Sequence, residues 1–219
     1  QRWRSLSRDG NRPVDEWQAH IGRVFYGLRG RRVQDYYQTF ASADYRLAHA
    51  LAQDYYDRVV KREVVRSSKF EVRTSNPEPR TSPLVIHEWG PGNGNLAACF
   101  LTHLKTLDKD GLIYPRVRYV LVDMHQAILD NAQNHPDLLP HRERVEALCA
   151  ETSSLAAVKD GTVDRIVCNE LWNDLPAKLM LRKGNEIEEE YLRPNLSEKR
   201  HAVIDDWSGF VRAFDGKNV

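Results

Sequence analysis

The chain has 219 residues, of which 41% are hydrophobic and 29% charged, and its formal net charge is +1 at pH 7. This length suits one α/β domain with a helical extension, and no apolar run approaches the roughly 18 residues that span a bilayer, so no membrane span is expected. Residues 1–80 hold 16 Lys+Arg against 10 Asp+Glu, but without an aromatic-basic motif or zinc-finger spacing a solvated basic helical face is favoured over a nucleic-acid site.

Apolar residues at three- and four-residue spacing predict helices in the first part of the chain. One is expected over residues 14–29 and a second over 42–62, with Ser42 as its N-cap. Residues 67–83 are polar and contain three prolines, which is typical of a linker. The first part of the chain is therefore predicted to be an N-terminal helical extension over residues 1–66.

From residue 84 onwards, short apolar runs alternate with helical patterns, which is typical of a parallel α/β sheet. Strands are expected over residues 84–89, 119–122, 145–149 and 164–168, and helices over 96–107 and 126–134. A hairpin is expected to follow, with strands over residues 179–182 and 186–192. Residues 84–219 are therefore predicted to form one Rossmann-like α/β domain.

Three glycines at alternate positions, Gly90, Gly92 and Gly94, follow the first of these strands. Glycine admits a positive φ and lets a ligand approach without a Cβ in the way. There is no Gly-Lys-Ser/Thr, which excludes a triphosphate P-loop, and the spacing differs from the GxGxxG of dinucleotide folds. Glu88 would repel a pyrophosphate but suits the amino group of S-adenosylmethionine, directly or through water. The turn therefore predicts an S-adenosylmethionine site.

Further candidate ligands to this cofactor follow the next two strands. Asp123 ends the second strand, where a carboxylate can accept hydrogen bonds from both ribose hydroxyls. Because adjacent parallel strands end in one crevice, Asp123 is expected to lie close to Glu88 and the glycines. Met124 could pack on the adenine, and Glu151 could meet the adenine amino group. The alternatives are that the glycines form a structural β-α turn with no ligand, that Asp123 is a helix N-cap and that Glu151 is a solvated loop acid.

The polar segment 169–176, Asn-Glu-Leu-Trp-Asn-Asp-Leu-Pro, follows the fourth strand, where substrate would face the transferred methyl group. This segment, residues 88–96 and Asp123 resemble the motifs of the MidA-like methyltransferases, which include a mitochondrial arginine methyltransferase that assists assembly of respiratory complex I. The resemblance covers about residues 84–193. Residues 40–44 resemble a segment that lies over the cofactor in that family.

The resemblance implies a class I methyltransferase fold and a protein arginine as the methyl acceptor. Glu170 is then the candidate to orient the guanidinium and accept its proton, with Asn169 and Asp174 as positioning groups. The alternative is that Asn169 and Glu170 only brace the loop at the strand end. Asn173 stands where the family has an aspartate, and the tail 194–219 is too short for the last three strands of the family's sheet. The sheet is therefore expected to be incomplete at the C-terminus, either because the sequence is part of a longer chain or because the architecture is truncated.

Three functions are compatible with these residues. The favoured one is an S-adenosylmethionine-dependent methyltransferase whose partner is a protein substrate. The alternative is a catalytically silent methyltransferase-fold assembly factor that binds a partner protein. A nucleotide-dependent oxidoreductase is disfavoured by the glycine spacing.

The remaining residues bear on metals and compartment. The histidines have no metal-ligand spacing, so no metal is expected. Three widely spaced cysteines in apolar contexts are expected to be buried, reduced thiols. Together with an Arg-rich opening they favour the mitochondrial matrix or the cytoplasm. The sequence does not predict an oligomeric state.

Overall fold

The computed structural model describes residues 3–7, 10–29, 32, 39–70, 82–151, 156, 158–197, 199 and 206–215. The chain forms two compact units, one from residues 1–28 and 172–219 and the other from residues 29–171. This grouping differs from the predicted domains, because the start of the chain and its last third share one unit. Each unit is described by itself below.

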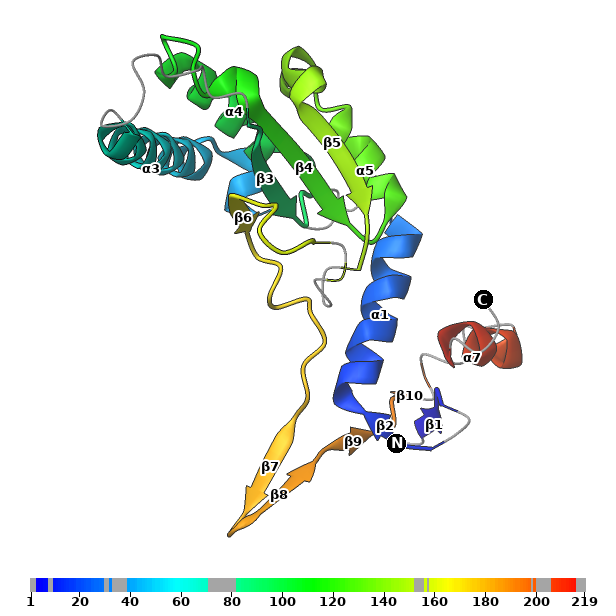
Figure 1. Cartoon of the computed structure of the whole chain (residues 1–219). Helices are drawn as coiled ribbons and strands as arrows, with labels where there is room; N and C mark the ends of the chain where they lie inside the picture. Colours follow the sequence, from blue (N-terminus) through cyan, green and yellow to red (C-terminus); the bar gives the residue numbers. More distant parts are fainter. Residues whose placement is uncertain are drawn as a thin grey trace. The chain divides into compact units, whose positions relative to one another are not determined.

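The second unit is built on a four-stranded parallel sheet with the order β5-β4-β3-β6 (Figure 1). The strands are β3 (Leu84–Trp89), β4 (Val117–Asp123), β5 (Val145–Cys149) and β6 (Arg165–Cys168). Trp89 at the end of β3 lies beside Val122 of β4 and Cys168 of β6. The four predicted strands are confirmed, and their carboxyl ends meet at one edge of the sheet.

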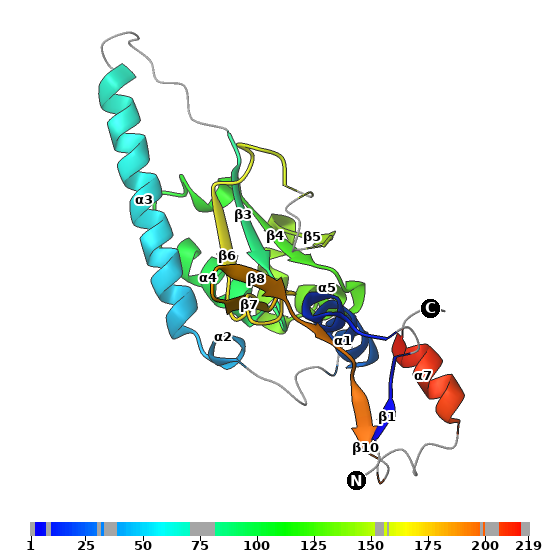
Figure 2. The ribbon, with the colours of Figure 1, turned by 90° about the horizontal axis from the view of Figure 1, so that it is seen from below.

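Helices in this unit precede and connect the strands. They are α2 (Phe40–Ala43), α3 (Arg46–Phe70), α4 (Asn95–Leu107) and α5 (Gln126–Gln133), with the 3-10 helices η2 (Tyr114–Arg116) and η3 (Pro136–Arg144). Helix α3 packs against α4, and the two are seen together in Figure 2. The helices expected at residues 96–107 and 126–134 are confirmed.

The prediction of one helix over residues 42–62 is wrong in one respect, because the helical segment is interrupted at Asp44. Ser42 lies inside the one-turn helix α2, so it is not the N-cap of the longer helix. The Asp44 carboxylate accepts a hydrogen bond from the backbone N–H of Arg46, 2.8 Å away, at the start of α3. Helix α3 also continues to Phe70, into the predicted linker, whose residues 71–81 lie outside the described part of the chain.

The main core lies on the helical face of the sheet. Alternate side chains of a strand point to opposite faces, so Ile86 of β3 shares one face with Tyr119 and Leu121 of β4. These buried side chains pack with apolar residues of α3 and α4. Trp89, Val120 and Val122 form a smaller cluster on the opposite face. The larger cluster holds α4 in place. This helix begins directly after residues 90–94, which we call the glycine turn.

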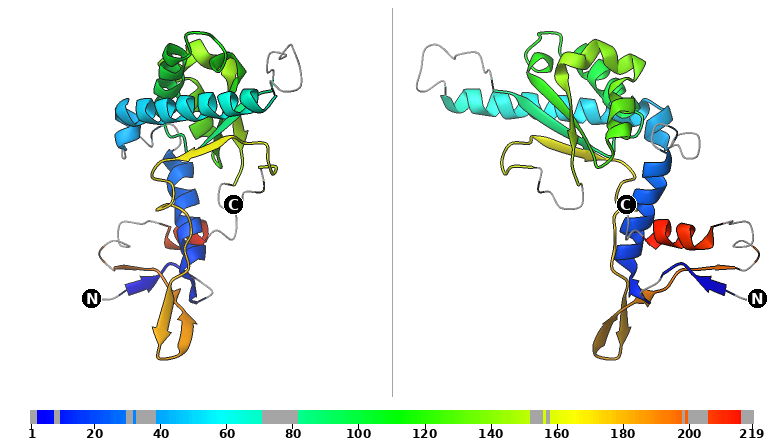
Figure 3. Two further views of the ribbon diagram at one scale, coloured as in Figure 1. Left: turned by 60° about the vertical axis from the view of Figure 1, so that its left-hand side comes forward. Right: turned by 90° about the vertical axis from the view of Figure 1, so that its right-hand side faces the viewer.

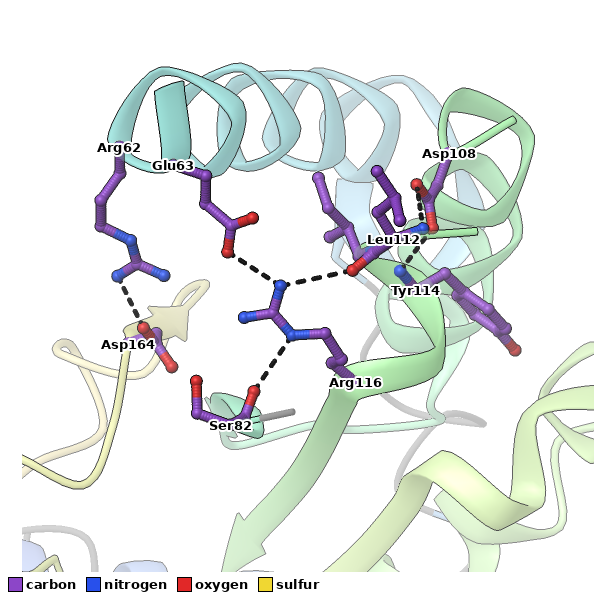
Figure 4. Close-up of polar contacts among 9 residues, drawn as sticks. Arg62, Glu63, Ser82, Asp108, Leu112, Tyr114, Arg116 and Asp164 are labelled. Atoms are coloured by element: carbon purple, nitrogen blue, oxygen red, sulfur yellow. Dashed lines mark hydrogen bonds and ion pairs between the residues drawn. The ribbon is translucent and has the colours of Figure 1, made fainter. Parts of the chain in front are cut away.

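Arg116 holds α3 against the opposite, N-terminal edge of the sheet (Figure 4). Its guanidinium donates to the Glu63 carboxylate at 2.8 Å and to the backbone carbonyls of Ser82 and Leu112 at 3.1 and 3.3 Å. The side chain is 13% exposed. Nearby, Arg62 of α3 pairs with Asp164 at 2.8 Å. These bonds tie one helix to the segments that precede β3, β4 and β6.

Replacing Arg116 by methionine should lower the free energy of unfolding by about 1–2 kcal/mol, because a largely buried charge pair loses one partner while the aliphatic stem is kept. Urea unfolding followed by circular dichroism measures this change. The control is Arg58→Met on the same helix, where Arg58 pairs with Asp54 in solvent. That variant should leave the midpoint unchanged. Equal midpoints for the two variants would contradict the role given to Arg116.

The first unit combines short paired strands with two helices, α1 (Val14–Arg29) and α7 (Trp207–Asp215). The strands are β1 (Trp3–Ser5), β2 (Arg12–Pro13), β7 (Met180–Lys183), β8 (Glu186–Glu189), β9 (Tyr191–Leu192) and β10 (Asn195–Ser197). Strand β1 pairs with β10, β2 pairs with β9, and β7–β8 form a hairpin, drawn in orange in Figure 3.

The predicted helix at residues 14–29 and the predicted hairpin are confirmed. The hairpin is shorter than expected, because its second strand ends at Glu189 and the next residues pair with β2. The predicted helical extension over residues 1–66 also contains the short strands β1 and β2. Trp17 anchors α1 in this unit, where its indole N–H donates to the carbonyl of Leu192 at 3.1 Å. Within the described ranges, no helix is long and apolar enough to cross a membrane.

Candidate functional site

The glycine turn between β3 and α4 is left-handed at each of its glycines, with φ of 69° at Gly90, 57° at Gly92 and 84° at Gly94. A Cβ on Gly94 would lie 2.6 Å from the backbone oxygen of Ala132 in α5. A Cβ on Gly92 would have no neighbour within 4 Å among the described residues. Gly94 is therefore needed for packing, whereas Gly92 leaves the backbone open to a ligand.

Asp123 lies at the same edge of the sheet as the glycine turn. The Gly90 N–H donates to the carbonyl of Val122 at 2.9 Å, which holds the turn beside the end of β4. One oxygen of Asp123 accepts from the backbone N–H of His125 at 2.8 Å and lies 3.3 Å from its imidazole Nδ1. The N-cap of α5 is His125, so the alternative of Asp123 as N-cap is wrong.

The two residues predicted to meet the adenine follow β4 and β5. Met124 is half-buried, and its backbone carbonyl accepts from the Cys149 thiol at 3.5 Å. Glu151 is exposed just beyond β5. Cys149 itself is exposed, so the expectation of three buried thiols is wrong at this position. The reason is that β5 is an outer strand of the sheet, with a neighbouring strand on one side, so its side chains have fewer neighbours.

Glu88 is 3% exposed and points into the helical face of the sheet. Its carboxylate accepts a hydrogen bond from the Tyr119 hydroxyl at 2.8 Å. Burial raises the pKa of Glu88 to about 8, and the Tyr119 hydrogen bond acts in the opposite direction. Burial also raises the pKa of Tyr119 well above its ordinary value. Glu88 is therefore largely protonated at neutral pH, until a positively charged group approaches it.

The turn after β6 carries two of the predicted catalytic residues. Asn169 is half-buried and Glu170 is exposed. Glu170 has φ of 53° and is the only described residue besides glycine with a positive φ. A Cβ on Gly90 would lie 3.2 Å from Leu171, so this turn touches the glycine turn. Left-handed backbone at a non-glycine residue is costly and is concentrated at functional sites.

Asp174 and Asn173 belong to the first unit, and both are exposed. The Tyr26 hydroxyl of α1 donates to the Asp174 carboxylate. The structure thus places Asp123 and Glu170 at the carboxyl edge of the sheet with the glycine turn, whereas the Glu88 carboxyl group is buried against Tyr119 and Asp174 lies in the first unit.

Two functional candidates were not singled out from the sequence. Asn93 and Asn95 flank Gly94, and both donate side-chain hydrogen bonds to the backbone of α2. Asparagine side chains often bond the backbone two residues further on in a turn, so Asn93 could have been noticed on that ground. Their bonds to α2 join segments about fifty residues apart, which no local pattern indicates. The described residues hold no group of His, Cys, Asp and Glu placed to bind a metal ion.

The sheet order, the left-handed glycine turn and the acid ending the neighbouring strand define a Rossmann-like fold of the class I methyltransferase type. Residues 70–213 match the model of the family described as "Putative S-adenosyl-L-methionine-dependent methyltransferase", and the chain belongs to this family. A comparison with curated proteins gave no match.

Two solved structures from Burkholderia thailandensis are similar to this chain. One is a COG1565 superfamily member bound to S-adenosyl-homocysteine, with 19% identity and a TM-score of 0.54. The match covers 90% of this chain and 50% of that protein's chain. The other is a native structure of an uncharacterized protein of the same superfamily, with 18% identity and a TM-score of 0.44. This match covers 88% of this chain and 46% of that protein's chain. The chain thus spans about half the length of these proteins.

Proposed function

We propose that this chain binds S-adenosylmethionine at the glycine turn and acts in a methyltransferase of the MidA-like type, with a protein arginine as the acceptor. The observation that carries the proposal is the left-handed turn Gly90–Gly92–Gly94 beside Asp123 at the end of the neighbouring strand. Membership of a family described as S-adenosylmethionine-dependent supports the same donor. The S-adenosyl-homocysteine bound to the solved structure of similar fold is consistent with it.

The residues at this edge suit the parts of the donor. The open space at Gly92 admits a ligand against the backbone. Asp123 would accept hydrogen bonds from the ribose hydroxyls, and Met124 and Glu151 would meet the adenine. The protonated Glu88 would become a carboxylate when the donor's ammonium group approaches, because an opposite charge favours the ionised form.

The acceptor chemistry depends on Glu170. When bound, S-adenosylmethionine supplies a methyl group on a positively charged sulfur. A nitrogen–carbon bond forms as the sulfur–carbon bond breaks, and the guanidinium nitrogen gives up one proton. Glu170 would orient the guanidinium and accept that proton, with Asn169 as a positioning group. The left-handed backbone at Glu170 is the structural observation that supports its selection.

Binding of S-adenosylhomocysteine, measured by calorimetry, tests the donor site. Asp123→Asn should weaken binding at least about tenfold, because the amide keeps an acceptor for the His125 N–H but replaces one oxygen needed by the ribose. The thermal midpoint serves as the folding control. Binding of NAD in place of S-adenosylhomocysteine, or equal affinity in the variant, would contradict the proposed site.

Methyl transfer requires a second experiment with labelled S-adenosylmethionine and candidate acceptor proteins, including assembly partners of respiratory complex I. Methylarginine in the acceptor supports the proposal, and Glu170→Gln should abolish it without loss of donor binding. Donor binding without transfer to any acceptor would favour the assembly factor instead. The mitochondrial matrix or the cytoplasm is the proposed location, which fractionation would test.

A further inference from the structure

Helix α2 is a single turn whose backbone groups are satisfied from two sides. At its N-terminal end, the Thr39 hydroxyl accepts from the N–H of Ser42 at 3.1 Å, and the Ser42 hydroxyl bonds the backbone of Thr39 in return. At its other end the last carbonyls of a helix lack partners within the helix. In α2 these carbonyls are bonded by residues of the glycine turn.

Two asparagines supply those bonds. The Asn95 side-chain amide donates to the carbonyls of Ala41 and Asp44 at 2.8 and 3.2 Å. The Asn93 side-chain amide donates to the carbonyl of Ser42 at 2.8 Å. The Asn93 oxygen also accepts from the backbone N–H of Asn95, the first residue of α4, at 3.1 Å. We call Asn93 and Asn95 the asparagine pair.

The position of α2 depends on these contacts. A helix of four residues has no stability of its own, because nucleation costs more than one turn of hydrogen bonds returns. Its main apolar anchor is Ala41, which is 5% exposed in the core beside α4. The asparagine pair therefore joins α2 to the glycine turn, with Asn93 between Gly92 and Gly94. Displacement of α2 and distortion of the turn are expected to occur together.

We propose that Asn93 and Asn95 are positioning residues that couple the docking of α2 to donor binding at the glycine turn. The inference rests on the proposed function, since it needs a donor at that turn. By linkage, a donor that binds the docked form must also stabilise docking, by the same factor that docking contributes to its affinity. Figure 2 shows α2 at the start of α3.

The test uses Asn93→Asp and Asn95→Asp with S-adenosylhomocysteine as the probe. Aspartate keeps the acceptor oxygen at the start of α4, where a negative charge is also favourable, but it cannot donate to the carbonyls of α2. Each variant should bind S-adenosylhomocysteine about tenfold more weakly than wild type. Hydrogen exchange is measured in parallel: the ligand should slow the amides of residues 40–45 in wild type and much less in the variants.

Matched variants separate the possible results. Asn93→Ala and Asn95→Ala should lose affinity similarly, which excludes an effect of the added charge. Asn185→Asp in the β7–β8 turn should bind like wild type. Protected α4 amides show that each variant is folded. If wild type binds the probe and the asparagine variants bind equally well with unchanged exchange, the coupling is wrong while the donor site stands. If wild type does not bind the probe, the proposed function is wrong, and the coupling with it.

Discussion

Replacing Gly94 by alanine should lower the free energy of unfolding by about 2–5 kcal/mol. The left-handed backbone at φ of 84° costs a residue with a Cβ about 1–2 kcal/mol. The new Cβ would also lie 2.6 Å from the Ala132 oxygen, and overpacking against backbone costs about 1–3 kcal/mol more. Urea unfolding followed by circular dichroism measures the change.

Two other glycines provide the controls. A Cβ on Gly92 or on Gly111 would meet nothing within 4 Å among the described residues, while φ is 57° and 65°. Gly92→Ala and Gly111→Ala should therefore show only the backbone cost of about 1–2 kcal/mol. Gly111 lies outside the proposed site, so only Gly92→Ala should also weaken S-adenosylhomocysteine binding. A Gly94→Ala midpoint equal to that of Gly111→Ala would contradict the close packing of the turn on α5.

Glu88→Gln should stabilise the protein at alkaline pH and have little effect at acid pH. The pKa of Glu88 is raised from 4.5 to about 8, so the folded protein keeps a proton that the unfolded chain releases. The contribution of Glu88 to stability is complete below pH 4.5, decreases as the pH rises, and is lost through pH 8. Glutamine stays neutral and can still accept from Tyr119. The difference in unfolding midpoint between variant and wild type should therefore grow from pH 5 to pH 9.

Tyr119→Phe provides the matched control for Glu88. The Tyr119 hydroxyl favours the ionised carboxylate, so its removal should raise the pKa of Glu88 further and extend the pH dependence to higher pH. A constant difference between Glu88→Gln and wild type across pH 5–9 would contradict the protonated state. If Glu88 meets the donor's ammonium group, wild type should also release a proton on binding, which calorimetry in buffers of different ionisation enthalpy detects.

The parts of the fold that follow from local pattern were predictable. Strands β3 and β4 are rich in apolar residues because both faces are largely covered, and the three glycines between β3 and α4 can be recognised from the sequence alone. The strands of the first unit were not predictable in the same way. Trp3 pairs with Ser197 and Arg12 with Leu192, and strands of two or three residues show no alternation.

Within the candidate site, the sequence predicted where a residue lies in the fold better than it predicted what surrounds its side chain. Asp123 and Glu170 lie at the sheet edge, as expected from strands that end there. The burial of Glu88 was not predicted, because it depends on Tyr119 lying across the same face. The break at Asp44 was missed for a similar reason. The carbonyls freed there are bonded by Asn95, and only the folded chain brings the two together.

Leu171 packs closely on Gly90, so the glycine turn and the turn that carries Glu170 lie against each other. A Cβ on Gly90 would lie 3.2 Å from the end of Leu171, and Leu171 directly follows Glu170. A side chain at Gly90 would displace the end of Leu171 by a few tenths of an ångström, next to the left-handed backbone of Glu170. The absent side chain of Gly90 thus leaves room for the turn that carries Glu170, and Gly90→Ala is expected to disturb both turns of the proposed site at once.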